Sequence, residues 1–301
     1  MVARFQANIA DTSSIGSPPC SRRVCHWLHR NRGEWILPGR AARDIDCAMD
    51  KAIKLGRFIF AAGIALLGIQ QILVGDFVQG VFIAPAWLPG RAFCAYLSGV
   101  ALFAAASGFA VTKQVRLPAQ SLAAVLALEL LVFQLPSPLA ILHDGVARTR
   151  AFETLAFAAA AAVLAGAPAA VVILGRLLFA FAMVVFGVQH FMYAGFVASV
   201  VPSWIPGPLA WTYLTGVAMI AAGLSLAVGT MARLSGFLLG IMFLLWVALL
   251  HAPRVAAHLG DEKEWNSAAV ALAMGGAAWI LAEGRQRREG ASPIGSSPSR
   301  R

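Results

Sequence analysis

The residues best suited to chemistry lie in the second half of the chain, near the ends of its apolar segments. They are Gln189, His190, Trp204, Tyr213 and His251. An imidazole can donate a hydrogen bond to a quinone oxygen while an indole or phenol ring stacks on the quinone plane. The pattern therefore predicts a quinone-headgroup site near the outer leaflet, with no covalently bound cofactor. The alternative is that these side chains cap helix ends and bond one another.

Glu129 lies deep inside an apolar segment, where an ionisable side chain is costly and often functional. It is a candidate intramembrane proton site, and its counterpart in the second half of the chain is Trp246. The alternative is a neutral carboxyl that hydrogen-bonds to a neighbouring helix. No metal site is predicted, because two histidines without a third ligand do not specify one.

Composition indicates that these residues belong to a membrane protein. Of the 301 residues, 59% are hydrophobic and 13% are charged, against about 25% charged in soluble proteins. The apolar residues come in blocks of about 20, the length of a bilayer-spanning helix. The net charge of +10 does not indicate nucleic acid, since Lys and Arg lie at the ends of apolar blocks, where they meet lipid headgroups. The expected partner is therefore the lipid bilayer.

Much of the sequence occurs twice. Leu55–Phe60 returns as Leu174–Phe179, 119 residues later, and Pro85–Gly90 returns as Pro202–Gly207, 117 residues later. Over the 33 residues that start at Pro85, 15 are identical in the second copy. A repeat of this length predicts two copies of one structural unit.

The expected fold is all-α, a polytopic membrane bundle of eight transmembrane helices arranged as two parallel four-helix repeats. The two units span residues 51–168 and 169–283, and the tails at 1–50 and 284–301 are predicted to be disordered because they are rich in Ser, Pro and Arg. The helices are expected near residues 55–74, 92–111, 117–136, 151–167, 173–194, 208–229, 233–251 and 265–282.

The distribution of charge predicts the orientation in the membrane. Ten Lys and Arg residues lie at one set of helix ends and five at the other, so the positive-inside rule places both termini in the cytoplasm. Because each copy has four helices, both copies enter from the same side, related by a pseudo-two-fold axis along the membrane normal. The two Pro-x-Trp-x-Pro-Gly stretches then lie in outer loops, either as interfacial anchors or as a lid.

Three stretches of the second copy resemble the DoxX family. They are Gly187-Val188-Gln189-His190 at the end of a helix, Pro202–Gly207 ahead of Tyr213-Leu214-Thr215-Gly216, and Leu249-Leu250-His251-Ala252-Pro253. The resemblance is best from Arg176 to Trp279, and Leu55–Gly166 is similar to a second copy. It implies a four-helix protein of the bacterial inner membrane. Because the family is named after a subunit of a thiosulfate:quinone oxidoreductase, it also implies a link to quinone chemistry.

Three functions are open. The first is an accessory or anchor subunit of a quinone-linked redox system, which binds a redox partner protein and has no redox centre of its own. The second is a quinone-reactive membrane oxidoreductase, and the third is a transporter of a small lipophilic solute between the two copies. The stretches Gly99–Leu102 and Gly216–Met219 are wholly apolar, whereas many DoxX members carry a glutamate there, and this favours the accessory role.

Overall fold

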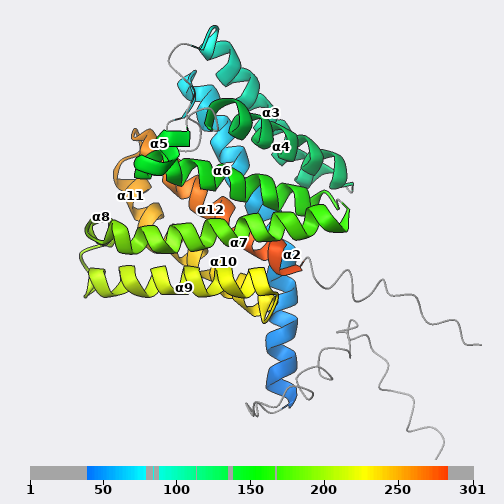
Figure 1. Ribbon diagram of the computed structural model, residues 1–301, viewed down its shortest axis with the longest axis vertical. Helices are drawn as coiled ribbons and strands as arrows, with labels where there is room; N and C mark the ends of the chain where they lie inside the picture. Colours follow the sequence, from blue (N-terminus) through cyan, green and yellow to red (C-terminus); the bar gives the residue numbers. More distant parts are fainter. Residues whose placement is uncertain are drawn as a thin grey trace, which may run out of the picture. The chain divides into compact units, whose positions relative to one another are not determined.

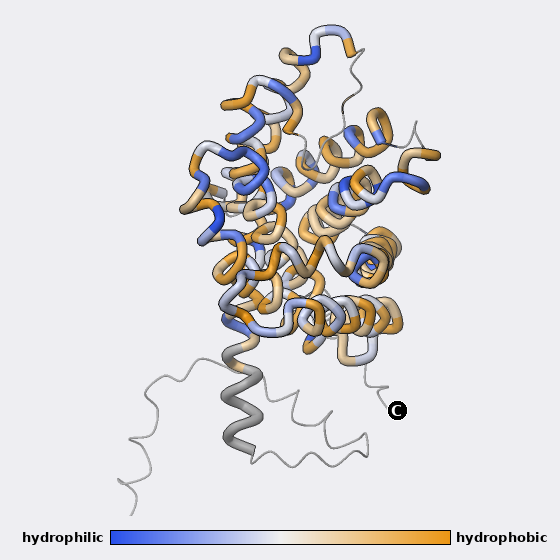
Figure 2. The backbone as a smooth tube through the Cα atoms, turned by 90° about the vertical axis from the view of Figure 1, so that its left-hand side faces the viewer, coloured by the Kyte–Doolittle hydropathy of each residue, from blue (hydrophilic) through white to orange (hydrophobic). Residues whose placement is uncertain are grey.

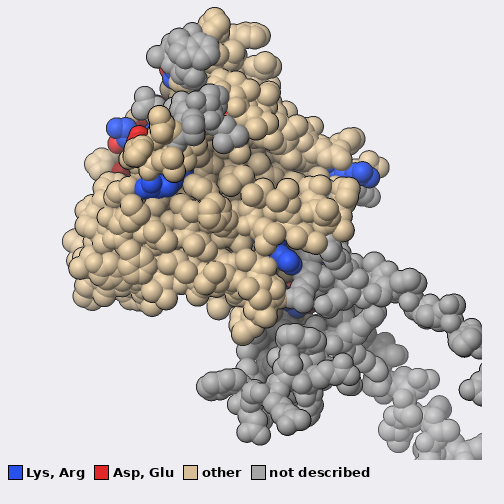
Figure 3. All heavy atoms as spheres, in the orientation of Figure 1, with Lys and Arg blue, Asp and Glu red and all other residues tan. Residues whose placement is uncertain are grey.

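The computed structural model describes residues 39–78, 84, 88–112, 114–134, 138–166 and 168–283, and these residues form helices and connecting turns without any strand. Seven of the described helices are long and apolar enough to cross a membrane. Apolar residues follow one another along most of the helical backbone (Figure 2). The face that carries α7 and α9 is almost free of charged side chains (Figure 3). The protein is therefore a multi-pass helical membrane protein.

The elements follow one another without sheets between them (Figure 1). They are α2 (Gly39–Val74), α3 (Arg91–Val111), α4 (Arg116–Glu129), η1 (Leu130–Gln134), α5 (Pro138–His143), α6 (Gly145–Leu164), α7 (Ala169–Met192), α8 (Ala194–Val200), α9 (Pro208–Val228), α10 (Ala232–Trp246), η2 (Val247–His251), α11 (Ala252–Ala257) and α12 (Glu262–Glu283).

Two of these elements differ from the expectation. Helix α2 begins at Gly39, so residues 39–50 of the expected disordered tail are helical. Residues 1–38 and 284–301 lie outside the described residues. Helix α6 is 20 residues long but is not among the seven apolar spans, because Arg148, Arg150 and Glu153 occupy its first half.

Residues from Ala52 onward form a compact unit of their own, and its helices pack through small residues. Helix α7 contacts α6 and α9, α10 contacts α9 and α12, and α4 contacts α3 and α6. A methyl carbon added to Gly68 would lie 2.7 Å from the Gly99 carbonyl oxygen, and one added to Gly187 would lie 2.7 Å from the Gly216 oxygen. Such close backbones are typical of helix association in lipid, where packing replaces the hydrophobic effect.

With the described chain divided between α6 and α7, the first helix of each half contacts the last helix of the other half. The amide of Gln189 on α7 donates to the carbonyl oxygen of Gly145, the first residue of α6. The amide of Gln70 on α2 donates to the carbonyl oxygen of Glu262, the first residue of α12. Gly145 and Glu262 are 117 residues apart. The two halves are therefore interlocked by crossed contacts.

The same crossing recurs at the other ends of these helices. A methyl carbon added to Gly175 on α7 would lie 3.1 Å from the Ala159 oxygen of α6, and one added to Gly56 on α2 would lie 3.1 Å from the Gly276 oxygen of α12. Helix α12 is the most enclosed of the seven spans, with 72% of its apolar window buried against 22–44% in the others. Its Ala- and Gly-rich sequence is what allows neighbouring backbones to surround it so closely.

The turn that follows α2 is fixed by charge. Arg91 Nε donates to Asp76 Oδ1 over 2.6 Å, and Arg91 Nη1 donates to the Ala84 carbonyl oxygen over 2.7 Å. The hydrogen bond from Arg91 holds the pKa of Asp76 below its ordinary value. The arginine thereby ties the start of α3 to the end of α2.

Candidate functional site

Most of the nominated side chains lie at one end of the bundle, which we call the distal end. There α2, η1, α7 and η2 finish, and α3, α6, α9 and α12 begin. The glutamine bonds from Gln70 to Glu262 and from Gln189 to Gly145 join helix ends at this level.

His190 lies near the end of α7, half-buried against α10. Its ring stacks on the indole of Trp246, with 5.8 Å between the ring centres and an angle of 25° between the planes. Trp246 in turn meets Phe243 edge-on at 5.2 Å. The Nδ1 atom of His190 lies 2.8 Å from the Phe186 carbonyl oxygen of its own helix. In a neutral imidazole Nδ1 is then the donor, which leaves Nε2 as an acceptor.

His251 ends the π turn η2, which begins directly after Trp246. Its Nδ1 atom is buried and has no hydrogen-bond partner among the described residues. Buried polar atoms without a partner are uncommon and call for an explanation such as a bound ligand or water. One turn further on, Arg254 and Glu264 form an ion pair with 2.6 Å between Nη2 and Oε1. The His190 ring on α7 thus stacks on the Trp246 ring at the end of α10, and His251 lies at the end of the π turn that comes next.

The other three nominated residues of the second half lie elsewhere. Gln189 is buried and faces α6, where its amide also donates to Thr149 Oγ1 over 3.0 Å. Trp204 is 65% exposed, in the turn before α9. Tyr213 is 40% exposed and stacks on Phe191 with 5.5 Å between ring centres. The structure therefore does not bring the five candidates together, and only the two histidines are linked to a common residue: His190 stacks on Trp246, and His251 ends the π turn that follows Trp246.

Trp246 was not among the residues nominated for this site. A signal for it exists in the sequence, because Trp246 stands 117 residues after Glu129, the spacing of the expected repeat. Both residues end an α-helix and are followed directly by a π turn. Short π segments inside α-helices are frequent at functional sites.

Glu129 is buried in the first half, with 4% of its surface exposed. Its Oε1 atom accepts a hydrogen bond from Ser98 Oγ of α3, and its Oε2 atom is buried without a partner in the part of the chain that is described. Gln71, fully buried on α2, donates from Nε2 to the Ala95 carbonyl oxygen over 2.9 Å. At the end of η1, Gln134 Nε2 donates to Thr154 Oγ1 of α6 over 2.9 Å. The polar residues of these helices are thus used in contacts between helices.

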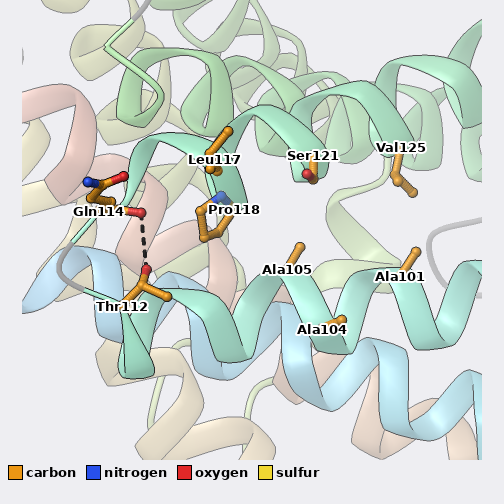
Figure 4. A pocket seen from close by; sticks show the side chains of 9 residues that line it. All are labelled: Ala101, Ala104, Ala105, Thr112, Gln114, Leu117, Pro118, Ser121 and Val125. Carbon is orange, nitrogen blue, oxygen red and sulfur yellow. Dashed lines mark hydrogen bonds between the residues drawn. The ribbon is translucent and has the colours of Figure 1, made fainter.

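A groove of about 650 Å³ lies between α3 and α4, away from every nominated residue. Its walls are formed by small and apolar side chains, and a hydrogen bond of 3.0 Å from Thr112 Oγ1 to the Gln114 carbonyl oxygen lies at one end (Figure 4). In the part of the chain that is described, no group of three His, Cys, Asp or Glu side chains is placed to hold a metal ion.

A protein-family model with the description "Domain of unknown function (DUF8561)" matches residues 179–282. The matched segment runs from α7 to α12 and includes His190, Trp246 and His251. Comparison with curated proteins gives no match, and neither does comparison with solved structures.

Proposed function

We propose that the protein is a membrane-integral accessory subunit that anchors a quinone-linked redox system, built from two parallel DoxX-like four-helix units. The architecture is supported by features that recur at a spacing of 117 residues. The π turns η1 and η2 recur at this spacing. So do Gly90 and Gly207, which precede α3 and α9 and both adopt the left-handed conformation.

In this proposal α6 is the eighth transmembrane helix, and both termini lie in the cytoplasm of a bacterial cell. Helix α6 has 20 residues, which is long enough to span the hydrocarbon core. Arg148 donates to the Leu142 carbonyl oxygen and to the Tyr193 hydroxyl, which satisfies this charge near the distal end. The ten-to-five distribution of basic residues supports the cytoplasmic position of the ends of the chain.

The observation that carries the anchoring role is the use of polar side chains as links between helices. Gln71, Gln134 and Gln189 are each at least 90% buried and donate to a neighbouring helix. Such bonds stabilise a membrane bundle and fix its geometry. A rigid bundle whose polar groups are used in this way is suited to holding another protein at the membrane.

Affinity purification from the native membrane tests this role. We expect the tagged full-length protein, extracted in a mild detergent, to retain a redox protein in a near-stoichiometric amount. The partner would be identified by mass spectrometry and by the absorption of its flavin, haem or iron–sulfur group. A tagged polytopic protein of similar size serves as the control. Recovery of the protein alone, in a detergent that preserves other membrane complexes, would contradict the anchoring role.

A second candidate function, quinone chemistry within this chain, is favoured by one observation. The buried Nδ1 atom of His251 has no partner among the described residues, and the π turn that His251 ends follows Trp246, which stacks on His190. With Nδ1 of His190 engaged by Phe186, a neutral His190 presents an acceptor. An acceptor suits the hydroxyl group of a quinol better than the carbonyl group of a quinone.

The double variant His190→Ala/His251→Ala separates the two functions. If this chain reacts with quinol, the variant loses about 100-fold or more of the quinol-dependent activity, the range for removing groups that move protons in the transition state. Expression and partner recovery should stay at the wild-type level. The exposed His258 offers the matched control, since His258→Ala leaves the stack intact. Unchanged activity in the double variant would remove the catalytic alternative and leave the anchoring role unaffected.

A further inference from the structure

The carboxyl group of Glu129 has surroundings that suit a neutral acid. It is 4% exposed, and within the described part of the chain the only hydrogen bond to it comes from Ser98. An ionised carboxylate in an apolar interior needs a paired cation or several donors, because its desolvation is costly. Among the described residues, the Ser98 hydroxyl is the hydrogen-bond partner of this carboxyl group, and no cation acts on it. A proton is the simplest group that neutralises it.

Gln71 provides an acceptor for the hydrogen bond that a protonated Glu129 would donate. Its Oε1 atom is buried and, like Oε2 of Glu129, has no hydrogen-bond partner among the residues that the structure describes. Gln71 and Glu129 bond to α3 at Ala95 and Ser98 respectively, which are three residues apart and therefore on one side of that helix. The two unpartnered oxygen atoms thus belong to side chains that converge on the same turn of α3.

The second half shows these two positions in direct contact. His190 corresponds to Gln71 and Trp246 to Glu129, and their rings are stacked. Gln71 and His190 also pack against corresponding glycines. A methyl carbon added to Gly99 would meet Gln71 Cβ at 3.4 Å, and one added to Gly216 would meet His190 Cβ at 3.0 Å. We infer that Gln71 lies close to Glu129 because the two halves correspond in the proposed function.

We propose that Gln71, Ser98 and Glu129 form a binding site for one proton inside the membrane region. The proton resides on Glu129 Oε2 and is donated to Gln71 Oε1, while Ser98 donates to Glu129 Oε1. One bound proton thereby removes the buried negative charge and satisfies both unpartnered oxygens. The second half holds no acid at the matching position, where Trp246 stands, so the site occurs once among the described residues of the chain.

No charged side chain of α3 or α4 pairs with Glu129 in the described part of the chain. On α3, Arg91 pairs with Asp76, and Cys94 and Tyr96 lie toward the same end of the helix. On α4 itself, Arg116 lies at the opposite end of the helix from Glu129.

On α6, the charged groups also act on one another or on backbone. Arg150 interacts with Glu153 and Asp144, and Arg148 bonds to Leu142 and Tyr193. On η1 the polar side chain is Gln134, which does not titrate. The charge state of Glu129 is thus governed by its burial and by the Ser98 hydroxyl.

Infrared difference spectroscopy on the full-length protein in lipid tests the site. The spectrum of the wild type minus that of Glu129→Gln at neutral pH should contain the carbonyl stretch of one protonated carboxyl group per chain, and this band should shift in D₂O. In Gln71→Leu the band should move to higher wavenumber, because the acid loses its acceptor. Ser98→Ala, which removes only the donor to Oε1, should retain the band.

Three outcomes would overturn the proposal. The absence of a protonated carboxyl band would show that Glu129 is ionised. A band that sodium chloride abolishes would show a cation site instead. A band that Gln71→Leu leaves unchanged would show that the proton is not donated to Gln71. Should Glu129→Gln fail to fold, the D₂O shift of the wild-type band and its response to Gln71→Leu give the same decision, and neither depends on a redox partner being found.

Discussion

Replacement of Gly276 by alanine is expected to destabilise the bundle by about 3 kcal/mol or more. The added methyl carbon would lie 2.2 Å from the backbone nitrogen of Phe60 and 2.6 Å from its Cα. Overpacking costs about 1–3 kcal/mol even where side chains can move aside, and here the obstacle is the backbone of α2. Helix α12 can relieve the overlap only by moving away from α2, which opens the crossed contact between the halves. Unfolding in mixed micelles of increasing denaturing-detergent content measures the loss.

The neighbouring glycine provides the control. A methyl carbon on Gly275 would meet the Leu244 side chain at 3.2 Å, and a leucine side chain can yield by a few tenths of an ångström. Because alanine also favours a helix by about 1 kcal/mol over glycine, Gly275→Ala should change the unfolding free energy by less than about 1 kcal/mol. Equal losses of unfolding free energy in the two variants would show that the backbones of α2 and α12 are not in close contact at Gly276.

Reporter fusions should give an all-or-none result for the orientation of the chain. We expect a fluorescent reporter that matures only in the cytoplasm to be active at both termini and in a fusion that ends at Pro168, after α6. A phosphatase that is active only outside should give the complementary result, with activity in a fusion that ends at Asp144, before α6. These two positions flank the helix with three charged residues in its first half.

The fusions at residues 144 and 168 therefore decide whether α6 crosses. If α6 lay along the surface, the two positions would report the same side, and the termini would lie on opposite sides of the membrane. That result would leave seven crossings and would contradict the parallel eight-helix arrangement. A fusion at Val115, in the turn between α3 and α4, serves as the cytoplasmic reference, since it precedes α6 and the helices beside it are among the seven apolar spans.

The membrane-spanning character of the fold could be predicted because composition and block length decide it. The irregular elements could not. The π turns and the short helices α5, α8 and α11 arise from local hydrogen bonds at the ends of spans, where hydropathy carries little information. The helical start of α2 at Gly39 lies in a polar segment, and helix formation there has no apolar period to indicate it.

The candidate site could be predicted from the sequence less well than the membrane-spanning helices. Gln189 and His190 were assigned to one site, but consecutive residues of an α-helix point about 100° apart. The structure places Gln189 against α6 and His190 against Trp246. Helical geometry alone could have separated them. Which neighbouring helix each one faces could not be read from the sequence, because helix packing depends on the crossed arrangement of the two halves.

The crossed glutamine bonds have a consequence for symmetry. Two identical chains packed in this way would place the same residue at both matched positions, since a two-fold interface repeats every contact. In the proposed arrangement of two repeats, a single polypeptide fixes their ratio at one to one and releases each from that constraint. Gln71 and Glu129 can then differ from His190 and Trp246 without a mixture of assemblies, so that each molecule would carry the acidic cluster and the His190–Trp246 stack together.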